Sequence, residues 1–191
     1  GIPFQSDIAQ VSYFTNDLTT ETSGIDLVAT YNMDWSGGNT VLSAAGNWNS
    51  TKIKDRVNRG TTASPVYFIN DESKYDNENG NPEYRMNVTA RHTMNNDVTI
   101  TVRGNLYGPY KNAANATLAS IQEFGRVTQW DTDVSWDLSE AYRLTLGINN
   151  VFDTMPDMDT IGESCCGRTY RSDSVQDWQG TYYYVRGQIN F

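Results

Sequence analysis

Apolar and polar residues alternate along seven stretches of the sequence, and this alternation constrains the fold more than any other feature. In residues 24–35, every second residue from Ile25 to Trp35 is apolar or aromatic, whereas Asp26 and Asp34 lie between them. Successive side chains of a β-strand point to opposite faces of a sheet, so this period predicts a strand with one apolar face. The same pattern predicts strands near residues 24–35, 40–51, 83–92, 98–108, 128–138, 142–152 and 181–191. We therefore expect an all-β, antiparallel fold without a helix.

The connections between the predicted strands alternate in length. Tight turns are predicted at 36–39, 93–97 and 139–141, and long loops at 52–81, 109–127 and 153–180. Because antiparallel strands reverse direction at each connection, all the long loops lie at one end of the sheet. Transmembrane β-barrels have this asymmetry, with short periplasmic turns and long outer loops. The connections therefore favour a transmembrane barrel over a soluble sheet.

Charged and aromatic residues follow the same division. Every charge in the predicted strands lies on the polar face. This is expected for a membrane barrel, because a charge that faces lipid costs about 2–4 kcal/mol. A soluble core would exclude charges from the apolar face too. The aromatic rings are more informative, because they gather at both strand ends as in the girdles of membrane barrels. They are Trp35, Trp136, Tyr142 and Phe191 at the tight-turn ends, and Trp48, Tyr84, Trp130 and Tyr183 at the long-loop ends.

Composition limits how the chain would cross a membrane and what it would bind. No stretch reaches the roughly 18 to 20 apolar residues of a membrane helix, so a crossing would use strands. The net charge of -9, without a cluster of Lys and Arg, excludes a surface for nucleic acid. Seven strands are too few and odd in number for a closed bacterial barrel, and an open sheet would expose two edges to hydrocarbon. We therefore expect the C-terminal part of a larger barrel.

A motif near the end of the chain points to a family. Residues 144–156 resemble the N-N-L-F-D-x-x-P signature of TonB-dependent outer-membrane receptors, carried by Asn149, Asn150, Val151, Phe152, Asp153 and Pro156. Residues 22–27 are similar to the family's x-x-G-[IV]-E-[LV] strand start, with Asp26 in place of Glu, and residues 182–191 are similar to its terminal strand. The resemblance covers essentially the whole chain.

The resemblance implies a barrel of about 22 strands around an N-terminal plug domain, in the bacterial outer membrane. Such a receptor imports a scarce nutrient with energy from the inner-membrane TonB complex. This chain would supply about the last third of the barrel, without the plug, surrounded by the lipid bilayer and lipopolysaccharide. Phe191 would form part of the signal read by the barrel-assembly machinery. The imported substrate would be a siderophore-iron complex, cobalamin or an oligosaccharide.

The last long loop contains the candidate ligand contacts. They are Arg168, Tyr170, Arg171 and Trp178, for which ordinary packing of a solvated loop is the alternative. The acidic residues Asp157, Asp159 and Glu163 match no calcium-loop spacing. We therefore expect no metal site and no cofactor, with calcium in the outer loops as the alternative.

The two cysteines, Cys165 and Cys166, are adjacent and cannot join distant parts of the fold. In an oxidising extracellular loop with neighbouring glycines, a vicinal disulfide is the leading hypothesis. Intermolecular pairing and free thiols are the alternatives, and a metal site is less favoured because no further Cys or His lies nearby.

No group of residues predicts an enzyme. His92 is the single histidine, and no nucleophile signature accompanies it. We therefore expect a transporter segment without catalytic residues. The alternatives are a secreted, soluble β-sandwich or lectin-like binding module, and a fragment of another outer-membrane barrel such as a porin.

Overall fold

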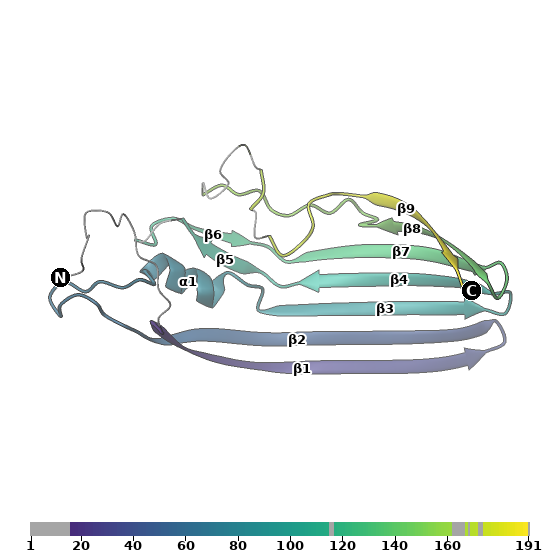
Figure 1. Ribbon diagram of the computed structural model, residues 1–191, viewed down its shortest axis with the longest axis horizontal. Coiled ribbons are helices and arrows are strands. Elements are labelled where there is room, and N and C mark those ends of the chain that lie inside the picture. Colours follow the sequence, from purple (N-terminus) through teal and green to yellow (C-terminus); the bar gives the residue numbers. More distant parts are fainter. Residues whose placement is uncertain (1–15, 115–116, 162–166, 168, 172–173, 191) are drawn as a thin grey trace, which may run out of the picture.

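The computed structural model describes residues 16–114, 117–161, 167, 169–171 and 174–190, and its main element is a seven-stranded sheet (Figure 1). All neighbouring strands are antiparallel, in the order β1-β2-β3-β4-β7-β8-β9. The strands are β1 (Leu18–Trp35), β2 (Gly38–Arg56), β3 (Tyr84–Met94), β4 (Val98–Tyr107), β7 (Val127–Asp137), β8 (Tyr142–Asn149) and β9 (Tyr182–Ile189). The predicted all-β, antiparallel sheet of seven strands is confirmed, and it is open, with β1 and β9 as its edges.

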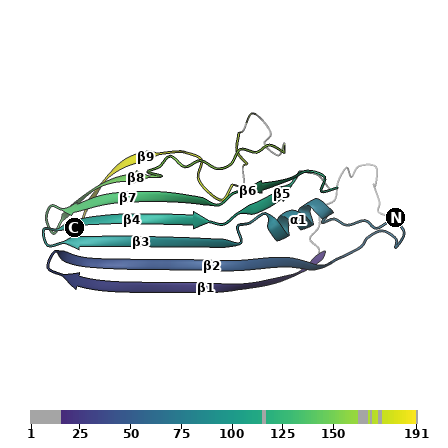
Figure 2. The ribbon, with the colours of Figure 1, turned by 180° about the vertical axis from the view of Figure 1, so that it is seen from behind.

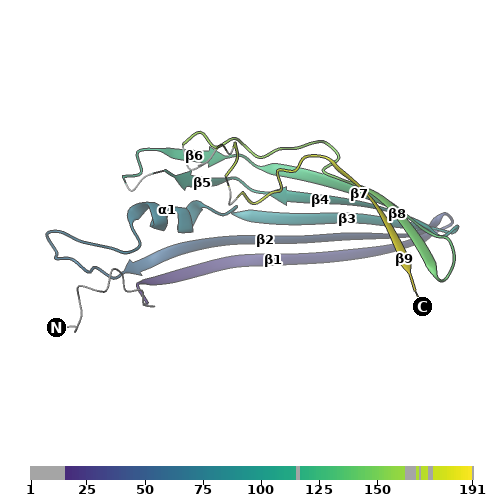
Figure 3. The ribbon, with the colours of Figure 1, turned by 45° about the horizontal axis from the view of Figure 1, so that its top comes forward.

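The two ends of the sheet differ, as Figures 1 and 2 show. The tight turns gather at one end, which we call the turn end. The connection after β2, with its helix, and the hairpin after β4 lie at the other end, which we call the loop end. Strands β8 and β9 swing away from the direction of β1 and β2 (Figure 3).

The strand register places small residues opposite large ones on the apolar face. A continuous row of paired residues crosses five strands and runs Ala29, Ala44, Val88, Gly104 and Trp130. The Trp130 ring lies over Gly104, where an added Cβ would come within 2.9 Å of the ring. The indole thus fills space that the glycine leaves, and a side chain at position 104 would have to displace it.

Nothing among the described residues covers the apolar face of the sheet. Its residues are among the most exposed large apolar side chains of the described chain, with Ile25 at 74%, Leu27 at 67% and Val185 at 71%. The buried apolar residues of the described chain are Ile53, Tyr110, Ala113, Phe124 and Val127. All five belong to the loop end or the strand ends beside it, so the sheet itself has no core within the described residues.

A helix contradicts one prediction. The range 52–81 is predicted as a loop, but it contains α1 (Asp71–Asn79), so the expectation of a fold without a helix is wrong. The helix buries none of its residues and has no apolar stripe, so the hydrophobic pattern could not reveal it. Its sequence signal is the N-cap, where Asn70 Oδ1 accepts the backbone N–H of Ser73 at 2.8 Å. No helix among the described residues is long and apolar enough to span a membrane.

The range 109–127, predicted as a loop, contains the hairpin of β5 (Tyr110–Ala113) and β6 (Ile121–Phe124). The rings of Tyr110 and Phe124 stack with their centroids 4.7 Å apart. Together with Ala113, this stack accounts for three of the five buried apolar residues, so the hairpin supplies most of the small core of the loop end.

The first two strands extend beyond their predicted bounds. Strand β1 begins at Leu18 instead of residue 24, and β2 continues to Arg56 instead of ending at residue 51. Polar pairs hold this extension, including an ion pair of 2.8 Å between Lys54 and Glu21. The alternation of apolar and polar residues ends where the apolar face ends. The backbone hydrogen bonds between β1 and β2 continue beyond that point, because they do not depend on apolar side chains.

Candidate functional site at the loop end

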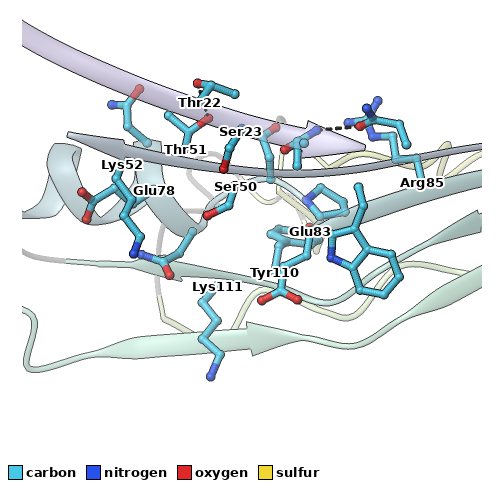
Figure 4. A pocket seen from close by; sticks show the side chains of 18 of the residues that line it. Thr22, Ser23, Ser50, Thr51, Lys52, Glu78, Glu83, Arg85, Tyr110 and Lys111 are labelled. Carbon is cyan, nitrogen blue, oxygen red and sulfur yellow. Dashed lines mark hydrogen bonds between the residues drawn. The ribbon is translucent and has the colours of Figure 1, made fainter. Parts of the chain in front are cut away.

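A large cavity lies at the loop end, where side chains of β1, β2, α1 and β5 line it (Figure 4). We call it the loop-end cavity, and its volume is 1290 Å³. Hydroxyl and amide side chains form much of its wall, namely Thr22, Ser23, Asn47, Asn49, Ser50, Thr51, Asn77, Asn79 and Asn81. The charged lining residues are Asp26, Lys52, Lys54, Lys74, Glu78, Glu83, Arg85 and Lys111.

Cross-strand hydrogen bonds arrange the β1–β2 wall. The hydroxyl oxygens of Thr22 and Thr51 lie 2.9 Å apart. Asn47 Nδ2 donates to Asp26 Oδ1 at 2.5 Å, and its own Oδ1 accepts from Asn49 Nδ2 at 2.6 Å. These side chains belong to the polar face, so the wall continues the polar face toward the loop end.

Glu78 fixes α1 against β2. Its Oε1 accepts the backbone N–H of Ile53 at 2.8 Å, and its Oε2 lies 2.6 Å from Lys74 Nζ. Burial by itself would raise the pKa of this carboxyl, but the hydrogen bonds from Lys74 and Ile53, together with the charge of Lys52, lower the pKa below its ordinary value of 4.5. Glu78 is therefore ionised at neutral pH and holds the helix in place.

The opposite wall is tied to the same helix. Asp76 Oδ1 accepts the backbone N–H of Ala113 at 2.8 Å, which connects α1 to β5. On the same hairpin, Lys111 Nζ lies 2.9 Å from Glu123 Oε2. The hydrogen bond to Glu123 raises the pKa of Lys111 above its ordinary value.

These ion pairs determine what the cavity can bind. Lys54, Lys74 and Lys111 each have a carboxylate partner, and Lys52 and Arg85 are matched in number by Asp26 and Glu83, so the wall is mostly neutral and rich in hydrogen-bonding groups. Within the described ranges, no group of three or more His, Cys, Asp and Glu side chains could hold a metal ion. The cavity suits a polar solute that makes many hydrogen bonds.

Three of the predicted ligand contacts are described, namely Tyr170, Arg171 and Trp178, and they are not among the lining residues of this cavity. The Tyr170 and Trp178 rings meet edge to face with centroids 6.2 Å apart, and Trp178 is half-exposed. Arg171 is buried at 8% exposure, so its side chain is not on the surface. Arg168, the cysteines Cys165 and Cys166, and Phe191 lie outside the described residues.

The motif around Asn150 forms a tight turn after β8. Asn150 and Asp153 have positive φ angles of 49° and 53°, which asparagine and aspartate tolerate better than most residues. Asn150 Oδ1 accepts the backbone N–H of Thr154 at 2.8 Å, and Asn150 Nδ2 donates to the Thr154 carbonyl at 2.9 Å. The turn is therefore closed by one buried side chain.

The same turn joins three parts of the chain. The backbone N–H of Val151 donates to the carbonyl of Trp130 in β7 at 2.7 Å. The backbone N–H of Thr181, which precedes β9, donates to Asp153 Oδ1 at 3.0 Å. In the same motif, Phe152 is exposed and Pro156 is buried. Asn150 and Asp153 thus have a structural role, connecting β7, β8 and the approach to β9.

Sequence reasoning missed the loop-end cavity. Its lining comes from β1, β2, α1, β5, the start of β3 and the segment before it, which carry no shared motif. The one available signal was the density of Asn, Ser and Thr in residues 47–51 and 77–81, which also describes an ordinary solvated loop.

Comparisons with known proteins support the fold. No protein-family model matches the sequence, and no curated protein matches it. Among solved structures, the chain is similar to the ferric yersiniabactin uptake receptor FyuA from Yersinia pestis, with a TM-score of 0.52 and 16% sequence identity. The similarity covers 92% of this chain and 24% of that chain, so this chain spans about a quarter of the receptor's length. At this identity the likeness shows the fold alone, an antiparallel sheet like part of that receptor's barrel.

Proposed function

We propose that this chain is a segment of the barrel wall of a TonB-dependent receptor, in the bacterial outer membrane, that imports a scarce nutrient. The observation that carries the proposal is the two-faced sheet. Ile25, Leu27 and Val185 are exposed on one face, while Arg103 and Asp133 pair on the other. A lipid-facing wall with a polar interior needs this division.

The uncovered apolar face argues against an isolated sheet in water. Burying apolar surface stabilises a protein by about 25 cal/mol per Å², so a soluble sheet of this size would cover that face with a second layer. Beyond the main sheet, the described residues offer α1 and the short β5–β6 hairpin, both at the loop end. The soluble β-sandwich is therefore the weaker hypothesis.

The open edges argue for further strands. In hydrocarbon, unpaired backbone groups cost several kcal/mol each, so membrane sheets close into barrels. The edges β1 (Leu18–Trp35) and β9 (Tyr182–Ile189) differ greatly in length, which makes them poor partners for each other. We infer that other strands of the same protein complete the barrel.

The remaining parts of the proposal follow from the motif and from the structural likeness to an uptake receptor. The partners would be a plug domain, the TonB complex, lipopolysaccharide, and the assembly machinery that reads Phe191. The wall of the loop-end cavity favours a hydrogen-bonding substrate. The substrate classes that the resemblance implies are siderophore-iron, cobalamin and oligosaccharide. We expect no enzymatic activity and no cofactor.

Two neighbouring residues test the proposal. Leu27 and Val28 are both aliphatic and both well exposed, at 67% and 76%, but they lie on opposite faces of β1. Against lipid, Leu27→Arg should cost about 2–4 kcal/mol, whereas Val28→Arg should cost little. We expect Leu27→Arg, in the full-length protein, to reduce the heat-resistant folded form in the outer-membrane fraction, and Val28→Arg to leave it near the wild-type level. Equal tolerance of both substitutions would contradict a lipid-facing apolar side.

A further inference from the structure

A second cavity on the polar face gathers arginines. It has a volume of 380 Å³ and lies toward the turn end, across β3, β4, β7, β8 and β9. Its charged lining residues are Arg91, Arg103, Asp133, Arg143 and Arg186. We call it the arginine cavity. Four guanidinium groups and one carboxylate line it, although the protein as a whole carries a net charge of -9.

Ion pairs neutralise only part of this charge. Arg103 Nη2 lies 2.7 Å from Asp133 Oδ2, and Asp133 is buried. Arg143 makes a two-pronged contact with Asp137, with Nη2 to Oδ2 at 2.7 Å. Within the described part of the chain, Arg91 and Arg186 have no ion pair. Two guanidinium groups therefore remain for another partner.

The rest of the lining also suits an anion. Thr99, Thr101 and Thr145 are buried in the wall, at 5%, 6% and 7% exposure. Hydroxyl groups donate hydrogen bonds to oxyanions, and the planar guanidinium fork matches carboxylate and phosphate oxygens. Arg186 lies 5.5 Å from the centre of the Tyr184 ring, which holds its guanidinium at the cavity.

The loop-end cavity lacks this surplus. Three of its lysines are paired with carboxylates, and its two other cations, Lys52 and Arg85, are matched in number by the lining carboxylates of Asp26 and Glu83. The charge excess on the polar face is therefore concentrated at the arginine cavity.

We propose that the arginine cavity binds a small oxyanion that carries two or more carboxylate or phosphate groups. Arg91 and Arg186 would supply the charge, and Thr99, Thr101 and Thr145 the neutral wall. If the polar face lines a barrel interior, the imported substrate would be anionic. This conclusion about the substrate rests on the proposed function, whereas the binding of an oxyanion does not.

Citrate is the probe, because it is a small trivalent carboxylate. The full-length protein, purified in detergent, is titrated with citrate while its unfolding temperature is measured. Sodium chloride at equal ionic strength and the neutral polyol sorbitol serve as controls. We expect citrate to raise the unfolding temperature more than either control does.

Substitution of the two arginines without ion pairs tests the site. In Arg91→Gln/Arg186→Gln, the dissociation constant for citrate should rise roughly tenfold or more, because each charge-assisted hydrogen bond contributes substantially to binding. The unfolding temperature without citrate should stay the same or rise, since like charges are removed. Arg126→Gln is the matched control, because Arg126 is exposed and lies outside the cavity.

Several results would overturn the proposal. These are a citrate effect no larger than that of sodium chloride, an equal loss in Arg126→Gln, or an unchanged dissociation constant in the double variant. If the wild-type protein does not bind citrate and the double variant has a lower unfolding temperature than the wild type, an acidic side chain of the same protein fills the cavity instead.

If the double variant does not fold, Arg91→Lys/Arg186→Lys is measured in its place, because it keeps the charge. This variant should bind citrate with intermediate affinity, and an affinity equal to that of the wild type would overturn the proposal too. The amount of the heat-resistant folded form is measured in the same samples, and it tests the proposed barrel independently of citrate binding.

Discussion

The backbone N–H of Asn150 donates to Oδ1 of Asp131 at 2.8 Å, so the turn after β8 is tied to the polar face of β7. Asp131 Oδ2 in turn accepts from Asn105 Nδ2 at 3.3 Å, and Asn105 Oδ1 accepts from Asn87 Nδ2. A line of polar side chains thus runs from β3 to the turn. The motif that suggested a family therefore has a physical role of its own, which is to fix the end of one strand to the sheet.

Replacing Asn150 by alanine should destabilise the protein strongly. The change removes both side-chain hydrogen bonds to Thr154, and alanine is less favourable than asparagine at a positive φ. We expect a loss of about 2–4 kcal/mol. Asn149→Ala is the matched control, because Asn149 is exposed, and it should change stability by less than about 0.5 kcal/mol. Thermal unfolding in detergent measures both, and equal effects would contradict the role given to Asn150.

Gly147 should not accept a side chain. It lies opposite Tyr184 in the β8–β9 pair, and an added Cβ would come within 2.2 Å of the Tyr184 ring. Gly147→Ala must displace that ring, and we expect a loss of about 1–3 kcal/mol of stability. Gly187→Ala should be nearly neutral, since nothing lies within 4 Å of its added Cβ.

A second substitution can relieve the same clash. Adding Tyr184→Ala to Gly147→Ala should cost less than the sum of the two single changes, because the residues are in contact. Additive unfolding free energies would show that Tyr184 is not the obstacle.

The attachment of α1 should weaken in acid. The pKa of Glu78 is lowered in the folded protein, so its contribution is present above the ordinary value of 4.5 and is lost as pH falls through the folded value. Hydrogen exchange of the Ile53 amide, which donates to Glu78, should therefore accelerate, relative to other amides of β2, as the pH falls below 4.5.

Two variants check the origin of this effect. Glu78→Gln should make the relative exchange of Ile53 independent of pH in this range, because it removes the titrating carboxyl. Glu72→Gln, in the first turn of the same helix, should leave the acid response unchanged. If Glu78→Gln keeps the acid response, another group is responsible.

The sheet could be predicted because its pattern is repeated. In residues 24–35 every second residue from Ile25 to Trp35 is apolar or aromatic, and each of the seven strands carries a similar period. Strand ends were less predictable. Strand β8 ends at Asn149 and not near residue 152, because Asn150 adopts a positive φ that no hydrophobic pattern records.

The candidate sites could not be predicted in the same way. Residue type alone favoured Tyr170, Arg171 and Trp178 as ligand contacts, but in the structure the rings of Tyr170 and Trp178 contact each other and Arg171 is buried. The loop-end cavity depends on α1, whose position is set by Glu78 and Asp76 through contacts with backbone groups far along the chain. Such contacts leave no periodic signal.

The sequence by itself determined the strands and their two faces, because which side a residue faces depends only on its neighbours along the chain. Only the tertiary structure decided which charges meet. Arg103 pairs with Asp133 and Arg143 with Asp137, while Arg91 and Arg186, on the same polar side, have no such partner within the described residues. Pairing across strands depends on register and on side-chain reach, and both are fixed when the chain folds.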